Sequence, residues 1–474
     1  MHSGFLPSLL AVTVLLPPVY VQAAPAAAPA ETKHSNRPPN IIFFLTDDLG
    51  WGDPQCFGHP YIKTPNINRL AEQGTVFTQF YVASPVCSPS RVALMTGHYP
   101  ARYRIHIALG TPQRNAEYDM PNWLDPKVPT LAGCLKQAGY VTGHFGKWHL
   151  CGSPTPQPPS PAAYGFDDHR TVNTTGPGWE MNKDPYFRAH STGLIVDETI
   201  RFMRQHKDQP FYVNAWTLVP HAPLKSTDEE LAAYHDLKAD PDRFEGHMRE
   251  YARKAPDFNN QAKVFFAAVT GLDKAFGRLL DALEEMKLAE NTLIFFGSDN
   301  GPEDYHLAEA RNAGMGSPGP HRGRKRSIYE GGVRTSCIVR WPGHVPAGRV
   351  ERDSVLAGVD FLPTICRITG AAVPDIQPDG EDVSDILRGK SRPRMKSLFW
   401  EWRGPAFGDT AYRPPGLAVR DGNWKLLVNP DGTAAELYDI VQDPDERHNV
   451  AKDHPEIAGN LSRQVLAWKK TLPK

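Results

Sequence analysis

The sequence predicts an α/β protein: a large, mostly parallel sheet flanked by helices, plus a small C-terminal antiparallel sheet with one packed helix. Three continuous apolar runs of strand length, typical of strands buried on both faces, alternate with helical patterns before about residue 345. Beyond that point the strand-like segments become short and follow one another closely. Alternating strands and helices indicate a parallel sheet, whereas consecutive short strands indicate an antiparallel one.

The elements of the large sheet can be placed by their apolar patterns. Its strands are expected at residues 40–45, 140–142, 211–216 and 291–297. The helices that alternate with them are expected at residues 66–73, 130–138, 193–205 and 263–285. In the last of these, apolar residues recur at helical spacing, which predicts a helix packed along the sheet.

The C-terminal part has a different pattern of predicted elements. Its short strands are expected at residues 398–400, 417–420, 424–428 and 436–439, with a final helix from about 455 to 468. Asp421-Gly422-Asn423 is a hairpin signal between two of these strands. A chain of 474 residues is too long for one ordinary core. We therefore predict a large α/β domain over residues 40–370 and an α+β subdomain over residues 371–474.

The N-terminus is typical of an export signal. An apolar core at residues 9–16 precedes small residues at 21–24, so residues 1–24 are predicted to be a signal peptide and residues 25–39 a linker. An uncleaved anchor is the alternative, because no Lys or Arg precedes the apolar core. The run is short for a membrane span. The protein is therefore expected to be secreted or periplasmic, with no membrane partner.

Charge and cysteine content exclude several classes of function. The 52 basic and 53 acidic residues nearly cancel, so no overall field would attract nucleic acid or a membrane surface. An anionic substrate would need locally placed cations. The six cysteines are irregularly spaced and include no Cys-x-x-Cys pair, which argues against a disulfide framework and a zinc site.

Two of the predicted strands end in matching polar pairs. Asp47 and Asp48 follow the first strand, and Asp299 and Asn300 follow the last. The carboxyl ends of parallel strands meet at one edge of a sheet, where open α/β sheets build their sites. These side chains offer only oxygen ligands, which suit a hard divalent cation, and several ligands with little room for water favour Ca²⁺ over Mg²⁺. A role in a turn or as a cap would account for any one of these polar residues alone. It accounts less well for two matching pairs at the ends of two similar strands.

Several cationic side chains are candidates for binding an anion. Lys147 and His149 follow a strand-like segment and, in an extended chain, would share a face. His221 lies between two prolines, and Lys325 lies in a basic run where Arg324 and Arg326 are alternatives to it. Each of these residues, taken singly, also has a purely structural explanation: a loop histidine whose hydrogen bonds are satisfied, or a solvated run of basic residues.

One short motif connects these candidates. Cys87-Ser88-Pro89-Ser90-Arg91, followed by Met95-Thr96-Gly97, resembles the signature of the formylglycine-dependent sulfatases of the alkaline phosphatase superfamily. Similar family blocks follow in the family's order, at residues 40–53, 87–97, 146–150, 221–223, 298–301 and 325–334. The resemblance covers nearly the whole chain from about residue 38, and it includes sulfatases of the arylsulfatase and N-acetylgalactosamine-6-sulfatase types.

The resemblance implies a sulfuric ester hydrolase that acts on a sulfated saccharide or an aryl sulfate and releases inorganic sulfate. It implies that a sulfatase-maturing enzyme converts Cys87 to Cα-formylglycine, whose hydrate has two hydroxyls on one carbon. One hydroxyl attacks sulfur, and deprotonation of the other ejects the sulfate. It also implies a Ca²⁺ site formed by Asp47, Asp48, Cys87, Asp299 and Asn300.

The remaining roles also follow from the resemblance. Arg91 and His149 are expected to steady the aldehyde hydrate, with His149 as the base that releases sulfate. Lys147 and Lys325 are expected to bind the sulfate and bridging oxygens. His221 is expected to protonate the leaving alcohol.

Two other functions remain open. One is a phosphonate or phosphodiester hydrolase of the same superfamily, which a preference for phosphodiesters would reveal. The other is a catalytically inactive sulfoglycan-binding protein, of which Ser or Ala at position 87 would be the sign.

The substrate is expected to be selected by two long loops, at residues 99–123 and 151–184. Four basic side chains of the first loop could bind a second sulfate or a uronic carboxylate: Arg102, Arg104, His106 and Arg114. The alternative is that this loop is simply solvated.

Overall fold

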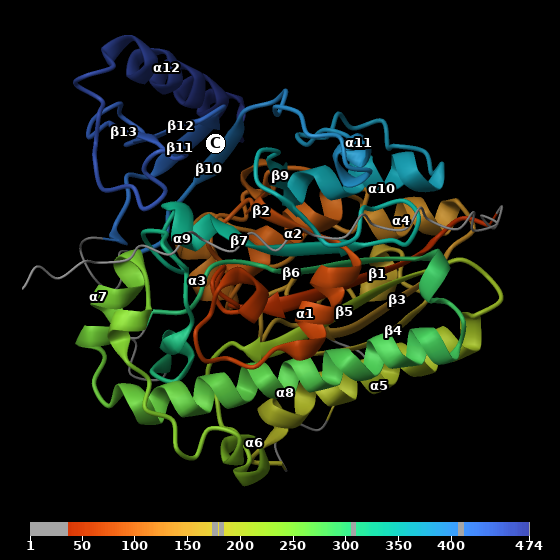
Figure 1. The fold of residues 1–474 in the computed structure, drawn as a ribbon. Helices are drawn as coiled ribbons and strands as arrows, with labels where there is room; N and C mark the ends of the chain where they lie inside the picture. The colour runs from red at the N-terminus through yellow and green to blue at the C-terminus, as the bar shows by residue number, and fades with distance from the viewer. Residues whose placement is uncertain (1–36, 173–178, 180–183, 305–309, 406–411, 474) are drawn as a thin grey trace, which may run out of the picture. The chain divides into compact units, whose positions relative to one another are not determined.

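Nine strands form the larger sheet of the computed structural model, which describes residues 37–172, 179, 184–304, 310–405 and 412–473 (Figure 1). Their order is β4-β3-β5-β1-β6-β7-β2-β8, and β9 pairs with β2. β7 is antiparallel to its neighbours β6 and β2, and the other pairings are parallel. The strands are β1 (Asn40–Asp47), β2 (Thr75–Tyr81), β3 (Val141–Lys147), β4 (Asp168–Val172), β5 (Phe211–Pro220), β6 (Thr292–Ser298), β7 (Arg334–Arg340), β8 (Arg349–Glu351) and β9 (Leu356–Ala357).

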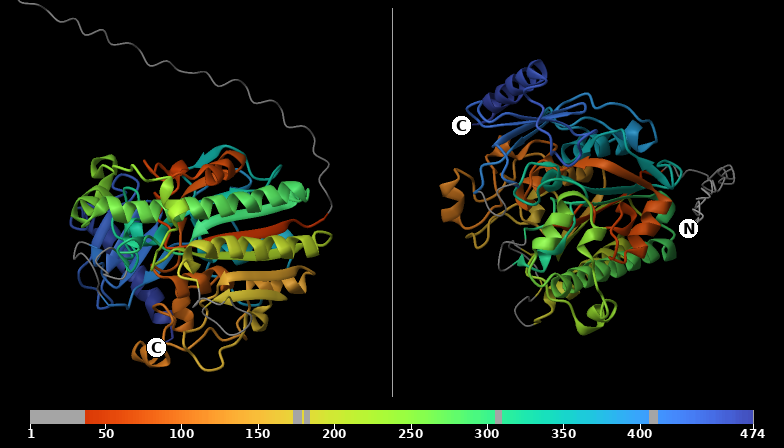
Figure 2. Two further views of the ribbon diagram at one scale, coloured as in Figure 1. Left: turned by 90° about the horizontal axis from the view of Figure 1, so that it is seen from below. Right: turned by 60° about the vertical axis from the view of Figure 1, so that its left-hand side comes forward.

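Helices cover both faces of this sheet because the central strands are apolar on both sides. Ile41 and Phe43 of β1 enter the core beneath α2, α4 and α10, whereas Ile42 and Phe44 enter the core beneath α1, α5 and α8. Figure 2 shows α5 and α8 side by side across the second face. These helices are α1 (Pro65–Gln73), α2 (Cys87–Thr96), α4 (Leu131–Gln137), α5 (Phe187–His206), α8 (Phe258–Glu285) and α10 (Phe361–Thr369).

Shorter helices lie in the connections. They are α3 (Pro112–Glu117), α6 (Asp228–Ala232), α7 (Gly246–Lys254), α9 (Glu330–Val333) and α11 (Ser384–Leu387). α3 is relevant to the site described below, because it begins just beyond the segment that faces Cys87.

The C-terminal sheet is a four-stranded antiparallel meander in the order β10-β11-β12-β13. One helix, α12 (Pro455–Thr471), packs on β11 and β12. The strands are β10 (Leu398–Glu401), β11 (Leu417–Asp421), β12 (Trp424–Val428) and β13 (Glu436–Asp439). Both sheets therefore confirm the predicted fold class.

A buried group of charges, the inter-sheet cluster (Glu330, Arg334, Lys425 and Glu446), joins the two sheets. Lys425 Nζ of β12 lies 2.8 Å from Glu330 Oε1 and 3.2 Å from Glu446 Oε1, and all three side chains have no exposed surface. Arg334 Nη1 lies 3.3 Å from Glu330 Oε2, and the Glu330 backbone N–H donates to Glu446 Oε2. The charges of the cluster are therefore paired with one another.

Some elements depart from the predicted bounds. β3 continues to Lys147 rather than ending near residue 142, and α5 begins at Phe187 rather than near residue 193. The Cys87 motif itself forms the first turns of α2. Its proline is tolerated there because first-turn residues have no helical partner for their N–H groups.

The predicted signal peptide and most of the linker lie in residues 1–36, outside the described residues. Within the described ranges, no helix has the length and apolar character needed to cross a membrane.

Candidate active site

The two polar strand ends meet at the carboxyl edge of the large sheet. β1 and β6 are parallel neighbours in register from Asn40↔Thr292 to Thr46↔Ser298, so the residues that follow them emerge together. The Asp48 N–H lies 3.2 Å from Asp299 Oδ1, and Asn300 Nδ2 donates to Asp48 Oδ1 over 2.7 Å. We call the buried group formed by Asp47, Asp48, Asp299 and Asn300 the edge cluster.

The chain brings Cys87 to this cluster at the start of α2. β2 leads toward the same edge, and the helix begins with Cys87, which is 2% exposed. Cys87 Sγ and one carboxylate oxygen each of Asp47 and Asp299 lie within 4.8 Å of one another. Arg91, four residues later, lies on the same side of the helix and faces Asp299.

Buried cations neutralise the carboxylates from one side. Arg91 Nε and Nη2 donate to Asp299 Oδ2 over 2.9 and 2.7 Å. Lys147 Nζ donates to both oxygens of Asp47, over 2.9 and 2.7 Å. Gly146 holds Lys147 in place, since its φ is 107° and a Cβ there would lie 1.9 Å from the Trp216 carbonyl oxygen.

His149 reaches the site by a turn rather than by strand alternation. β3 ends at Lys147, and His149 has a φ of 56°, so the expectation that an extended chain puts both residues on one face is wrong. His149 Nε2 lies 3.0 Å from the Leu109 carbonyl oxygen, to which it can only donate. Nδ1 has no partner among the described residues, and burial lowers the pKa of His149 to about 3. The neutral ring therefore has a free lone pair on Nδ1.

His221 lies beside Asp47 and Asp48 of the edge cluster. Its Nε2 is 3.8 Å from Asp48 Oδ2, and its Nδ1 is 2.6 Å from the Ala222 carbonyl oxygen. Burial, together with the nearby positive charge of Lys325, lowers the pKa of His221 to about 4. Nδ1 therefore carries the proton in the resting form, and Nε2 faces the cluster.

The basic run at 324–326 divides into three different environments. Lys325 Nζ donates to Asp48 Oδ2 over 2.6 Å and lies 3.1 Å from Glu303 Oε2. Arg324 instead donates to backbone carbonyl groups, and Arg326 pairs with Glu303. Of these three residues, Lys325 is the one that contacts the edge cluster.

The carboxylates of the cluster differ in their ionisation. Burial would raise the pKa of Asp47, but Lys147, His221 and Arg91 together hold it well below its ordinary value. Burial raises the pKa of Asp299 to about 7, and the negative charge of Asp47 adds to the rise, although Arg91 opposes it. An added divalent cation would favour the ionised form of Asp299.

The edge cluster has the donor set of a hard cation site. Its ligating atoms are carboxylate and amide oxygens, as Ca²⁺ prefers. Asn300 Oδ1 is buried and has no hydrogen-bond partner among the described residues, which is costly unless something else satisfies it. The residues therefore fit a bound divalent cation.

A cavity of about 190 Å³ opens above this cluster, and it contains Cys87. Its described lining residues are Val86, Cys87, Ile107, Ala108, Arg114, His149, His221, Lys325, Arg326, Trp402 and Pro405. Trp402 and the Glu303 carboxylate behind Lys325 were not predicted from the sequence to belong to the site. Glu303 follows Gly301 by two residues, so its position just beyond a strand end was the available signal.

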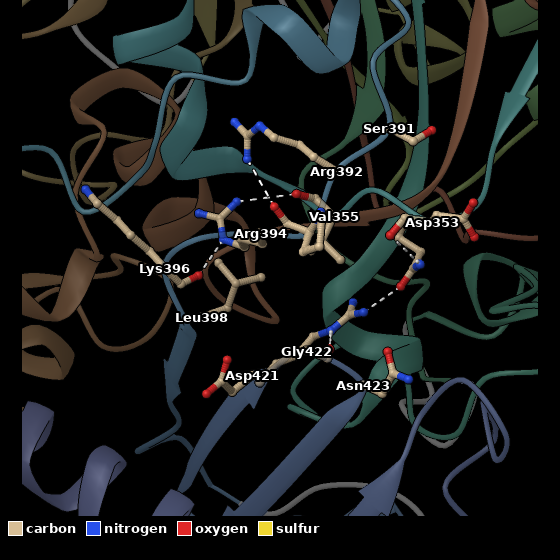
Figure 3. Close-up of a pocket in the computed structure, with 13 residues that line it drawn as sticks. Asp353, Val355, Ser391, Arg392, Arg394, Lys396, Leu398, Asp421, Gly422 and Asn423 are labelled. Carbon is tan, nitrogen blue, oxygen red and sulfur yellow. Dashed lines mark hydrogen bonds between the residues drawn. The ribbon is translucent and has the colours of Figure 1, made fainter.

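A second pocket, of about 280 Å³, lies between residues 391–398 and the β11–β12 turn (Figure 3). It is also rich in cations, but Arg394 pairs with both oxygens of Asp360, over 2.6 and 2.7 Å, and Arg392 pairs with Asp385 over 2.9 Å. Its described lining includes no Cys or His. It therefore lacks the groups that sulfate ester chemistry would use.

Comparison with solved structures shows that this architecture is a known one. A structure titled "Crystal structure of Ps i-CgsB in complex with k-i-k-neocarrahexaose" superimposes with a TM-score of 0.73 and 26% identity, over 91% of this chain and 93% of that one. The fold, with its polar cluster at the carboxyl edge of the large sheet, is of the alkaline-phosphatase-like class.

The sequence comparisons identify the family. Residues 39–371 match the family described as Sulfatase, and residues 322–471 match "N-sulphoglucosamine sulphohydrolase, C-terminal". Arylsulfatase A of Homo sapiens is 30% identical over 91% of this chain and 87% of its own. An N-acetylgalactosamine-6-O-sulfatase of Bacteroides thetaiotaomicron is 29% identical over 92% and 94%. The chain belongs to the sulfatase family and is a sulfuric ester hydrolase.

Proposed function

We propose that the protein hydrolyses sulfate esters of a sulfated carbohydrate, with Cys87 converted to Cα-formylglycine and Ca²⁺ held by the edge cluster. The observation that carries this proposal is the position of Cys87, at the floor of a cavity and within reach of Asp47 and Asp299. The carbohydrate part rests on relatives, one of them named as an N-acetylgalactosamine-6-O-sulfatase.

Two groups would complete the site. Formylglycine, as its hydrate, supplies a hydroxyl nucleophile together with a second hydroxyl that allows release, and Ca²⁺ supplies Lewis-acid polarisation. The ion would be held by oxygen atoms from Asp47, Asp48, Asp299, Asn300 and position 87. Asn300 Oδ1, which has no partner among the described residues, supports this assignment.

The cations of the site would bind and orient the anionic group. Lys147 and Lys325 bring positive charge to the sulfate oxygens, where negative charge develops as the ester breaks. Arg91 is fixed by Asp299 and steadies position 87. His149 would accept a proton at Nδ1, because Nε2 is engaged by the Leu109 carbonyl group and the ring rests in its neutral form.

His221 would protonate the leaving alcohol through Nε2. Its Nδ1 is fixed by the Ala222 carbonyl group, which leaves Nε2 facing the cluster. The ring is neutral at rest, and an anionic ester entering beside it would raise its pKa toward the range of a useful acid.

The proposal also includes how the protein matures. We expect an exported protein, secreted or periplasmic, whose signal peptide is removed. During maturation its partner is a formylglycine-generating enzyme that recognises Cys87, Pro89 and Arg91 in the chain.

Mass spectrometry of the Cys87 peptide, after expression with a maturing enzyme, tests the proposal. We expect a loss of about 18 Da, as thiol becomes aldehyde, together with sulfate release that is absent from Cys87→Ala. An unmodified thiol in an efficient sulfatase would overturn the nucleophile. Full conversion, with phosphodiesters cleaved in preference to every sulfate ester tried, would overturn the substrate class.

A further inference from the structure

The cavity above Cys87 has a basic lining. Its described lining contains no carboxylate, and its ionisable members besides Cys87 are all basic: Arg114, His149, His221, Lys325 and Arg326. Four of these come from the neighbourhood of the edge cluster. Arg114 comes from α3, at the outer side of the cavity, and it is exposed.

Arg114 differs from the other basic side chains of its loop because those side chains are ion-paired. Arg102 pairs with both oxygens of Asp379, Arg104 lies 3.3 Å from Asp119, and His106 lies 2.8 Å from Glu401. Among the described residues, Arg114 has no carboxylate within 4 Å and its side chain makes no hydrogen bond. Of four candidates in this loop, one retains an unneutralised charge at the cavity.

Local structure fixes where the Arg114 side chain starts. Thr111 caps α3 by accepting a hydrogen bond from the Arg114 backbone N–H over 3.3 Å. The aliphatic part of the side chain then lies over Gly110, where a Cβ atom would be 3.2 Å from Arg114 Cδ. The absence of a side chain at position 110 therefore lets Arg114 lie back along the loop toward the cavity.

The size of the cavity determines which part of a substrate meets Arg114. A volume of about 190 Å³ is below the roughly 300–1,000 Å³ of sites that enclose a whole small ligand. The cavity would therefore enclose the scissile sulfate and part of one sugar ring. Trp402 and Ile107 supply apolar walls for that ring, and the rest of the saccharide would lie outside, beside Arg114.

We propose that Arg114 binds a second anionic group, a carboxylate or a further sulfate ester, on the saccharide whose scissile sulfate occupies the cavity. The planar guanidinium can bind either group through two parallel hydrogen bonds. The proposal rests on the sulfatase function proposed above, and it assigns the substrate to the polyanionic saccharides rather than to neutral glycans with a single sulfate.

The test uses a monosulfated N-acetylhexosamine, the same sugar with a second sulfate, and the same sugar linked to a uronate. kcat/KM is measured for the mature enzyme, for Arg114→Gln and for the matched control Arg104→Gln, which removes the same charge from the same loop. We expect Arg114→Gln to lower the preference for one doubly charged sugar about tenfold, mainly through KM. Arg104→Gln should leave that preference unchanged, and Arg114→Lys should restore part of it.

Each outcome decides something different. Loss of preference for the disulfated sugar alone identifies a second sulfate, and loss for the uronate-linked sugar alone identifies a carboxylate. An equal effect of Arg114→Gln on all three sugars, or no preference in the wild type, would overturn the role of Arg114. If the mature enzyme hydrolyses 4-nitrophenyl sulfate but none of the sugars, both the role of Arg114 and the carbohydrate assignment fail, while the sulfatase chemistry remains.

Discussion

Two buried ionic clusters in this protein use similar residues for different purposes. The edge cluster sets Asp47, Asp48 and Asp299 against Arg91, Lys147 and Lys325, and the inter-sheet cluster sets Glu330 and Glu446 against Lys425 and Arg334. In each, burial raises the pKa of one carboxyl group, Asp299 or Glu446, to about 7. Charge balance and burial alone therefore do not distinguish a functional cluster from a structural one.

The difference lies in what each cluster leaves open. The inter-sheet cluster contributes no residue to the lining of the two cavities described above, and its Glu330 carboxylate receives Lys425, Arg334 and the Tyr81 hydroxyl. The edge cluster borders a cavity, and around it Asn300 Oδ1 and His149 Nδ1 have no partner within the described chain. Glu446 Oε1 of the inter-sheet cluster also has no hydrogen-bond partner among the described residues, but Lys425 Nζ lies 3.2 Å from it. Unsatisfied buried acceptors beside a cavity indicate a site that binds something, whereas an acceptor enclosed beside its own cation indicates a site that holds the fold together.

The largest expected effect separates the clusters by activity. Lys147→Ala removes a buried positive charge from the proposed sulfate site, so we expect kcat/KM for sulfate esters to fall about a thousandfold. The measurement is sulfate release by the variant after its formylglycine content has been matched to that of the wild type. A variant that retains more than a tenth of the activity would place Lys147 with the structural charges instead.

The next largest effect is expected on stability, and it distinguishes the inter-sheet cluster from the edge cluster. Lys425→Met leaves two buried carboxyl groups without their cation, and we expect the free energy of unfolding to fall by about 3–5 kcal/mol. Denaturant titration measures this, with activity per folded molecule as the second readout. Adding Glu446→Gln should recover part of the loss, because Glu330 keeps Arg334 as its partner and no buried carboxylate is then left without a cation. A loss of activity without a loss of stability would contradict the structural role.

A third prediction addresses the proton donor of the edge cluster. If His221 protonates the leaving group, His221→Ala should lower kcat/KM about a hundredfold for an alkyl or sugar sulfate. The same variant should change 4-nitrophenyl sulfate hydrolysis less than tenfold, since nitrophenolate leaves without a proton. Equal losses on both substrates would instead indicate that His221 binds the substrate or positions Asp48.

The smallest effect concerns pH. If Asp299 is a Ca²⁺ ligand, as proposed above, Ca²⁺ binding requires its ionised form; because its pKa is raised to about 7, protons and Ca²⁺ should compete for the edge cluster. We expect Ca²⁺ affinity to fall by up to about tenfold per pH unit as the pH drops below 7. Calorimetric titration at pH 5.5 and 7.5 checks this, and Glu446→Gln should not alter the dependence. A pH-independent affinity would show that Asp299 is not a ligand.

The sequence was sufficient for those parts of the site that strand ends and short motifs determine. Asp47, Asp48, Asp299 and Asn300 could be brought together because β1 and β6 are parallel and buried, and apolar runs reveal such strands well. The C-terminal meander was predictable for the same reason, from short strands and a hairpin signal.

What the sequence could not supply was the pairing of charges. Arg102 and Asp379 are 277 residues apart, and Lys325 and Asp48 are 277 residues apart as well. No local pattern reveals which arginine of a loop will be neutralised by a distant carboxylate. For the same reason the choice among Arg324, Lys325 and Arg326 needed the structure. The turn at His149 escaped prediction because a positive φ at a non-glycine residue leaves little trace in composition.

The burial of Cys87 has a consequence for the timing of biosynthesis. Every residue of α2, from Cys87 to Thr96, is buried once the chain has folded. An enzyme that must grasp Cys87 and Arg91 can therefore reach them only while this segment is still unstructured. If Cys87 is converted as proposed, a molecule that folds too early keeps its thiol, and the fraction of formylglycine in a purified sample would record how often modification preceded folding in the cell that made it.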